Sequence, residues 1–175
     1  MKQKWTLGAV ALLAALALPT TAAADTAPEQ VTTRVDGATV TTSEPIETKA
    51  ELNAFLQSDE PKTISVQAAT GKVVSVTEGI EPEMTTLATT VTSICNTGNA
   101  CLVASQVPYA NYGFSGVGTK TGSWSNRIQW KTGQYTAKAW YSYNGTSVGW
   151  GVKAGPNSVI NIDEPVTAIQ VTIYS

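Results

Sequence analysis

The side chains that most often perform acid–base chemistry are scarce in this sequence. It contains no histidine, so the commonest general base and the commonest activator of a nucleophilic serine or cysteine are both missing. After Met84 the only side-chain carboxylates are those of Asp163 and Glu164, which are neighbours in the sequence. In an extended segment neighbouring side chains point to opposite faces, so these two cannot act together across one bond as a glycosidase pair does. We therefore expect a protein that is not an enzyme.

Sequence motifs for metals and cofactors are absent as well. There is no acidic calcium loop and no Gly-Lys-Ser/Thr phosphate loop, and a zinc site would need more ligands than two cysteines. The five basic residues between positions 85 and 175 are too widely spaced for a nucleic-acid patch. We expect no cofactor, no metal and no nucleic-acid partner, which leaves recognition of a target through the protein surface.

The only two cysteines, Cys95 and Cys101, lie in the segment CNTGNAC. Their spacing is not Cys-x-x-C, so a redox-active pair is not indicated. In an exported protein such a pair predicts an intramolecular disulfide, and Gly98 and Asn99 suit the tight turn that it would close.

The aromatic segment AWYSYNGTSVGW, residues 139–150, holds the main candidate for recognition. Asn144-Gly145 predicts a two-residue hairpin turn, because a type I′ turn needs positive φ at both central positions. In the resulting register Tyr141, Tyr143 and Trp150 lie on one face of the hairpin and Trp140 lies on the other.

Two interpretations of Trp140 stay open. Another loop could bury it, which is the more common position for tryptophan. Alternatively, it stands exposed beside Lys138 and Arg127, and the three side chains form a stacking and charge site for a polysaccharide or an anionic surface.

These residues belong to a region of short strands. Between residues 91 and 175, β-branched and aromatic runs alternate with turn residues, which predicts an all-β fold of six or seven short strands in a compact Greek-key sandwich or barrel. The glycine-rich segment 109–126 is expected to be a loop or a bulged arm. The last two strands are expected at about 158–162 and 167–174, separated by a break at residues 163–165. The long connection 107–121 is a candidate inhibitory loop for a protease, with the contact residues Pro108, Tyr109, Tyr112 and Phe114.

The start of the chain predicts export. Residues 1–24 combine two early lysines, an apolar run of about a dozen residues and a small-residue cleavage site, as a secretory signal peptide does. The run is too short to span a membrane. We therefore expect a secreted, extracellular protein without stable membrane insertion, and a monomer.

Residues 25–90 differ in composition from the rest. From Asp25 to Met84 there are eleven acidic and four basic side chains and one aromatic, Phe55. This composition predicts an acidic pro-segment or spacer, with cleavage of the chain between 84 and 93. Within it Thr48, with Glu51 three positions on, has the capping-box pattern of a helix start, so we expect a short helix at about 48–58. We also expect a hairpin at about 62–77 and linkers at 26–45 and 81–90.

The order of secretion signal, close cysteine pair and short Gly- and aromatic-rich strands, with the segments GSWSNR (122–127) and VTAIQVTIY (166–174), resembles a known group. These are the small βγ-crystallin-like proteins secreted by actinomycetes, which include a metalloproteinase inhibitor, an antifungal chitin-binding protein and a killer-toxin-like protein. The resemblance covers about residues 91–175 and implies a non-enzymatic secreted effector. The sequence lacks a calcium-loop signature and has fewer cysteines than the inhibitor type, so no inhibitory residue is carried over.

The functional prediction is therefore a secreted β-domain that binds cell-wall polysaccharide or another envelope component, or that acts as an antimicrobial. A secreted protease inhibitor and a structural protein of the cell surface are the alternatives.

Overall fold

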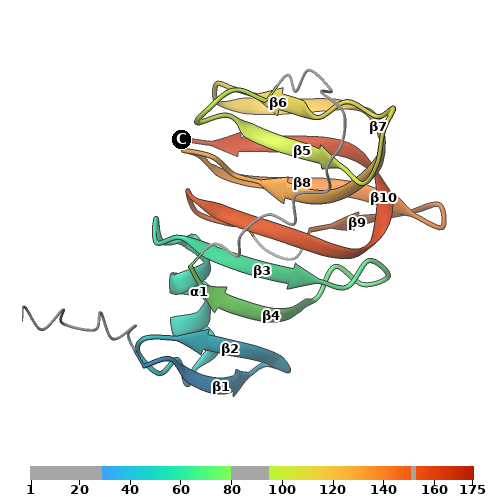
Figure 1. Cartoon of the computed structure of the whole chain (residues 1–175). Coiled ribbons are helices and arrows are strands. Elements are labelled where there is room, and N and C mark those ends of the chain that lie inside the picture. The colour runs from blue at the N-terminus through green and yellow to red at the C-terminus, as the bar shows by residue number, and fades with distance from the viewer. Residues whose placement is uncertain (1–28, 80–94, 151–152) are drawn as a thin grey trace, which may run out of the picture.

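The computed structural model describes residues 29–79, 95–150 and 153–175, and these form one mixed sheet of ten strands with one helix (Figure 1). The predicted all-β class is confirmed. The main path of the sheet runs β1 (Val31–Val35), β2 (Ala38–Thr42), β4 (Val73–Glu78), β3 (Lys62–Val66), β10 (Ser158–Tyr174), β7 (Gly118–Lys131), β5 (Ala100–Ala104) and β6 (Tyr112–Phe114). Outside this path, β8 (Thr136–Tyr143) pairs with β10 and with β9 (Thr146–Gly149).

The predicted disulfide is confirmed: Cys95 and Cys101 are bonded, with their Cα atoms 5.8 Å apart. In the described ranges no helix is long and apolar enough to cross a membrane. The expected signal peptide, residues 1–24, and the expected linker 81–90 lie outside the described residues.

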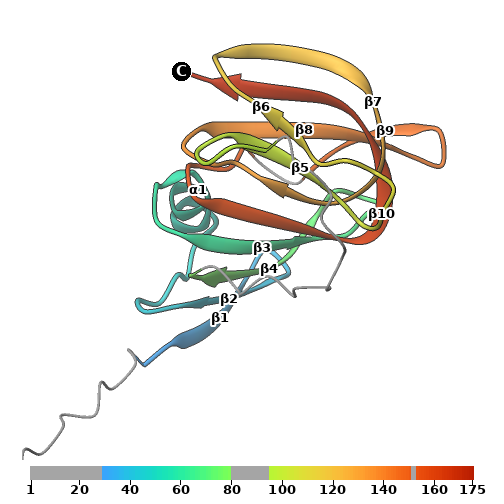
Figure 2. The same ribbon diagram turned by 45° about the horizontal axis from the view of Figure 1, so that its top comes forward.

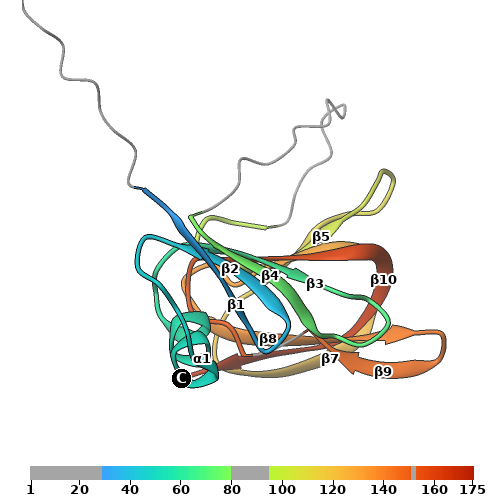
Figure 3. The same cartoon turned by 90° about the horizontal axis from the view of Figure 1, so that it is seen from below.

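The N-terminal part folds as two hairpins joined by a helix. β1 and β2 pair through Asp36-Gly37, which both have positive φ (51° and 86°), as a type I′ turn requires. The helix α1 (Lys49–Gln57) begins at the predicted capping box, where the Glu51 amide donates to Thr48 Oγ1 at 3.2 Å and the Thr48 amide donates to Glu51 Oε2 at 3.0 Å. The predicted second hairpin is present as β3 and β4. Figure 3 shows α1 lying on one face of these strands.

In the C-terminal part, the two long strands β7 and β10 each belong to two layers. The first five residues of β10 pair in parallel with β3, and residues 167–174 pair antiparallel with β8. β7 follows β10 along both stretches, with register shifts between Asn161 and Gln170. These shifts mark the bend at which β10 turns from one layer to the other (Figure 2). Three large aromatic side chains, Trp130, Tyr141 and Trp150, are buried in the core and at most 2% exposed.

One hydrophobic core runs through both parts of the chain. Val40, Leu56 and Ile64 of the N-terminal part belong to the same buried cluster as Ile160 and Trp150. The parallel β3–β10 pair is largely buried, and Ile64, Val66, Ile160 and Ile162 supply its apolar side chains. Residues 29–79 are therefore part of the central sheet and not a solvated spacer. Removal of residues 25–90 stays a prediction, as does the Greek-key arrangement.

Two expected irregular segments turn out to be strands. Within the expected linker 26–45, the Thr-rich stretch forms the hairpin of β1 and β2, because alternate residues of β2 are buried against the core. The segment 109–126, expected to be a loop or a bulged arm, contains β6 and more than half of β7, because its backbone pairs with β5 and β10 despite the glycines.

Candidate functional site

The candidate site is the outer face of the layer that contains β7, β10, β8 and β9. On β8 alternate side chains are buried, and each pairs with a buried residue of β10: Ala137 with Ile173, Ala139 with Val171, and Tyr141 with Ala168. The residues between them point the other way. The strand registers give this outer face, called the Trp140 face below, as Thr119 and Thr121 of β7, Gln170, Thr172 and Tyr174 of β10, Thr136, Lys138, Trp140 and Ser142 of β8, and Ser147 and Gly149 of β9. None of these residues is acidic.

Trp140 lies between the two interpretations that the sequence left open, because it is half-buried. The hairpin register is confirmed, with Trp140 opposite Gly149. A Cβ atom at position 149 would lie 3.2 Å from Cζ3 of Trp140 and 2.9 Å from Cε of Lys138, so both side chains rest on the β9 backbone. The ammonium of Lys138 lies 4.6 Å from the centroid of the Trp140 ring, a cation–π contact.

A second aromatic residue with a lysine occupies the same face. Tyr174 is half-buried, and Nζ of Lys153 lies 4.6 Å from its ring centroid. Tyr174 pairs with Thr136, four residues before Trp140 on β8, so the two aromatic positions are about 13 Å apart along the strand.

Hydroxyl and amide groups lie between the two aromatic residues. The Gln170 amide Nε2 donates to Thr172 Oγ1 at 3.3 Å, and the hydroxyls of Thr172 and Thr119 lie 3.1 Å apart. The Trp140 face can therefore offer aromatic rings, ammonium groups and neutral donors and acceptors to one extended ligand.

Arg127 does not belong to this face, which corrects the sequence prediction. It is 1% exposed, its Nε donates to Ser125 O at 2.7 Å, and one guanidinium nitrogen, Nη1, donates to Ala110 O at 2.7 Å. Its Cζ atom lies 5.3 Å from the Tyr112 ring centroid, and burial lowers the pKa of Arg127. Arginine can be buried here because backbone carbonyls satisfy its donors, so it braces the structure and is not available to a ligand.

The four residues of the candidate inhibitory loop fall into two groups. Pro108 and Tyr109 lie in the exposed connection between β5 and β6, and Tyr109 is 39% exposed. Tyr112 and Phe114 instead lie on β6, where Phe114 packs edge-on against Trp124 at 5.2 Å and Trp130 at 6.1 Å. Tyr112 and Phe114 are therefore part of the aromatic packing and do not project from a loop.

The two neighbouring carboxylates have separate partners. Asp163 Oδ1 accepts from the Ala68 amide at 2.7 Å, and Glu164 Oε2 accepts from the Tyr143 hydroxyl at 3.1 Å. The hydrogen bond to Glu164 raises the pKa of Tyr143. Within the described ranges, no three His, Cys, Asp or Glu side chains lie close enough together to hold a metal ion.

Sequence reasoning found Trp140 and Lys138 but missed Tyr174 and Lys153. The sequence pattern does indicate the face of Tyr174. In a strand Tyr174 points to the same side as Gln170 and Thr172 and to the side opposite apolar Val171. Lys153 follows a turn, and nothing local in the sequence indicates that it reaches Tyr174.

No protein-family model, curated protein or solved structure matches the chain. The resemblance to the βγ-crystallin-like group stays a prediction.

Proposed function

We propose that this protein is a secreted, non-catalytic binding protein that attaches to an acidic polysaccharide of a cell wall or envelope through the Trp140 face. One observation carries the proposal. Trp140 and Tyr174 lie on the same side of the sheet, each has a lysine ammonium 4.6 Å from its ring, and none of the side chains of the face is acidic.

The chemistry of the face fits such a ligand. The apolar side of a sugar ring stacks on an aromatic ring, and the sugar hydroxyls bond to threonine, serine and glutamine side chains. Lys138 and Lys153 supply positive charge for the carboxylate or phosphate groups of an acidic glycan. The two aromatic positions lie about 13 Å apart along the sheet, which suits an extended chain and not a single small sugar.

An envelope target agrees with the export that residues 1–24 predict. The disulfide between Cys95 and Cys101 is compatible with an oxidising compartment outside the cytoplasm. In this proposal the protein attaches to the envelope of a cell. Growth inhibition of a competitor is the biological effect to measure.

The test is co-sedimentation of the secreted protein with insoluble chitin, with bare peptidoglycan and with peptidoglycan that retains its anionic polymers. We expect the strongest retention on the anionic wall and a loss of retention as salt rises, because screening weakens the lysine contacts. Trp140→Ala and Tyr174→Ala should each weaken retention by about tenfold, as the loss of one stacked ring does at other aromatic sites.

The control is Tyr109→Ala, which removes an exposed ring outside the Trp140 face. It should leave retention unchanged. The proposal would be refuted if all three variants were retained equally well. It would also be refuted if neither the parent protein nor any variant were retained on any wall. Trp140→Ala should lose little stability, whereas a loss of about 3 kcal/mol or more would identify Trp140 as a core residue.

One observation favours protease inhibition as a second candidate function. The connection between β5 and β6 exposes Val107 (54%) and Tyr109 (39%), and buried Arg127 holds it from below through Ala110 O. A braced, exposed loop is the form in which a protein presents a segment to a protease cleft. Slowing of a secreted protease at equimolar protein, lost in Val107→Asp, would support this function; no effect on metallo-, serine or cysteine proteases would exclude it.

A further inference from the structure

A cavity of about 470 Å³ opens at the end of the layers where β6 meets β7, on the side opposite to the Trp140 face. Strand register separates most of the two surfaces, which share Thr119 at the edge of the cavity. Lys120 pairs with buried Val171 and Trp124 pairs with buried Ala168, so these β7 side chains point inward, whereas Thr119 and Thr121 point outward.

The wall of the cavity that borders the core is apolar, whereas its outer part is lined by polar groups such as Ser115 and Thr119. Val171 and Ile173 line the cavity and are only 1% and 4% exposed. Its walls are Tyr112, Phe114 and Trp124, and the Tyr112 and Phe114 rings pack against Trp124 at centroid distances of 6.5 and 5.2 Å. A volume of 470 Å³ is in the range of small-molecule sites.

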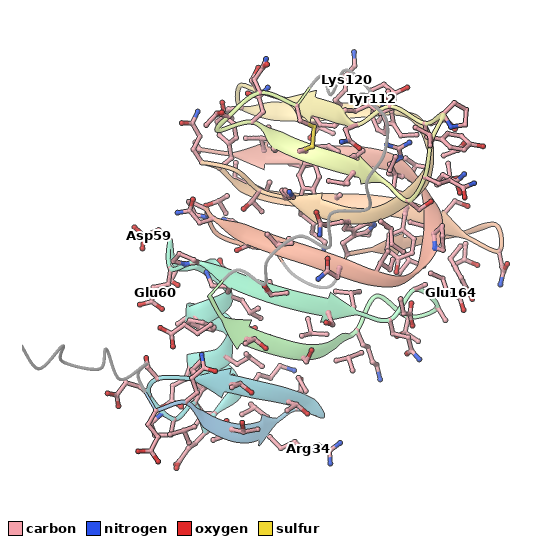
Figure 4. The ribbon with its side chains drawn as sticks, viewed as in Figure 1. Arg34, Asp59, Glu60, Tyr112, Lys120 and Glu164 are labelled. Carbon is pink, nitrogen blue, oxygen red and sulfur yellow. A yellow bond between two sulfur atoms is a disulfide. The ribbon has the colours of Figure 1, made fainter. Side chains whose placement is uncertain are left out.

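The rim of the cavity carries one charge. Lys120 is the only ionisable group among the lining residues apart from the Tyr112 phenol, and no carboxylate lines the cavity. Within the part of the chain that the structure describes, Lys120 is exposed and makes no ion pair. Figure 4 shows Lys120 and Tyr112 at the β6 end of the molecule, far from the acidic Asp59 and Glu60 at the end of α1.

The backbone at the mouth leaves room for entry. Gly116 and Gly118 line the cavity with φ of 81° and 134°, and a Cβ atom at either position would have nothing within 4 Å. Val117 between them is 68% exposed, so an apolar side chain stands at the opening.

The geometry points to a second binding site, for a small amphipathic anion whose apolar body enters between Phe114, Trp124 and Ile173 and whose carboxylate, sulfonate or phosphate meets Lys120. The apolar inner wall favours an apolar ligand body, and the single lysine at the rim, with no acidic side chain in the lining, favours an acid group at one end of the ligand. This site is independent of the polysaccharide function.

The test uses the full secreted protein and the fluorescent anion 1-anilinonaphthalene-8-sulfonate. We expect saturable binding of one dye per protein, displaced by octanoate and not by octylamine, which has the same chain length and the opposite charge. Amide NMR signals that shift with octanoate should be those of residues 112–120 and 124. Trp140→Ala should bind the dye as the parent does, which separates this site from the Trp140 face.

Lys120→Glu should weaken the binding of dye and octanoate by about fivefold. The matched control is Arg34→Glu, the same charge change on exposed β1 at the other end of the molecule (Figure 4), which should bind as the parent does. Both variants must show the parent's thermal transition, because unfolded forms also bind this dye. Absence of saturable binding at millimolar octanoate, equal displacement by octylamine, or equal binding by the two variants would overturn the inference.

Discussion

At the scale of single residues, Tyr141 joins the two parts of the molecule. It is fully buried, its hydroxyl donates to Ala68 O at 2.7 Å, and its ring packs edge-on against Trp150 at 5.8 Å. Burial raises the pKa of Tyr141 from its ordinary value of 10.0 to about 12. The fold therefore favours the protonated hydroxyl, which alone can donate to the carbonyl.

This shift fixes a pH window for stability. Because the folded pKa lies above the unfolded one, the contribution of the Tyr141 hydroxyl is fully present below pH 10 and is lost as the pH rises through about 12. Tyr141→Phe should lower the free energy of unfolding at pH 7 by about 1–2 kcal/mol. It should also reduce the decline in stability between pH 10 and 12.

Urea unfolding followed by tryptophan fluorescence at several pH values measures both effects. Tyr109→Phe serves as the control, since its ring is exposed and its loss of a hydroxyl should leave the profile unchanged. A Tyr141→Phe profile that declines as steeply as the parent's would show that Tyr141 does not carry the effect.

Residues whose position depends on local strand register were placed correctly from the sequence, and a residue whose position depends on distant contacts was not. Trp140 and Tyr141 were assigned to opposite faces correctly, because side-chain alternation in a strand depends only on register. Arg127 was misplaced, because charged side chains are mostly exposed and its burial depends on carbonyls of distant segments such as Ala110. Contacts of this kind are set by the tertiary fold and leave no local pattern in the sequence.

At the scale of elements, the turn between β3 and β4 is held against β9. A Cβ atom at Gly71 would overlap the carbonyl oxygen of Gly149, and Gly71 has a φ of 68°. Gly71→Ala should therefore lower the free energy of unfolding by about 2–5 kcal/mol, because both the left-handed backbone and the overlap are unfavourable. Gly37→Ala, with a φ of 86° and nothing near the added atom, should cost only about 1–2 kcal/mol.

Thermal and urea unfolding of the two variants distinguish packing from backbone conformation. Gly71→Ala should also weaken polysaccharide retention, because the displaced Gly149 lies beneath Trp140. Equal destabilisation by the two substitutions would mean that the turn yields without disturbing β9.

Elements with strong local signals were predictable, and those that depend on distant pairing were not. The capping box located α1, and Asn144-Gly145 located the β8–β9 turn. The Asp36-Gly37 pair is a comparable turn signal, but the flanking stretch lacks large apolar residues and was interpreted as a linker. β10 was expected to break at residues 163–165, yet it continues through a bend that shifts the register around Pro165, where a missing amide hydrogen is tolerated.

At the scale of the whole molecule, the acidic and basic parts share one sheet. Composition separated them, because residues 25–84 carry one aromatic side chain and a large negative charge. Composition does not report on pairing between strands that are about 100 residues apart, such as β3 and β10. The N-terminal part needs few aromatic residues of its own because it completes a core that the C-terminal part supplies.

This continuity makes the C-terminal part dependent on the N-terminal one. Without β3, the first half of β10 would lose five backbone pairings and expose Ile160 and Ile162, which are 2% and 4% exposed in the intact fold. Gly155 N would lose its bond to Leu56 O (2.9 Å), and Tyr141 would lose its acceptor on Ala68. A protein that lacks residues 25–90 should therefore show no cooperative thermal transition, and the separately produced segment 25–79 should restore one when added.

Calorimetry of the shortened protein, of the segment and of their mixture measures this dependence. If the chain is cut between residues 84 and 93 during secretion, native mass spectrometry should find the two pieces still bound to each other, because the β3–β10 pairing does not need the connecting peptide. A shortened protein that unfolds cooperatively and is retained on the anionic wall would instead establish residues 25–90 as a removable pro-segment. The two results assign different roles to the acidic part: a permanent half of the sheet, or a temporary cover for the hydrophobic edge of β10.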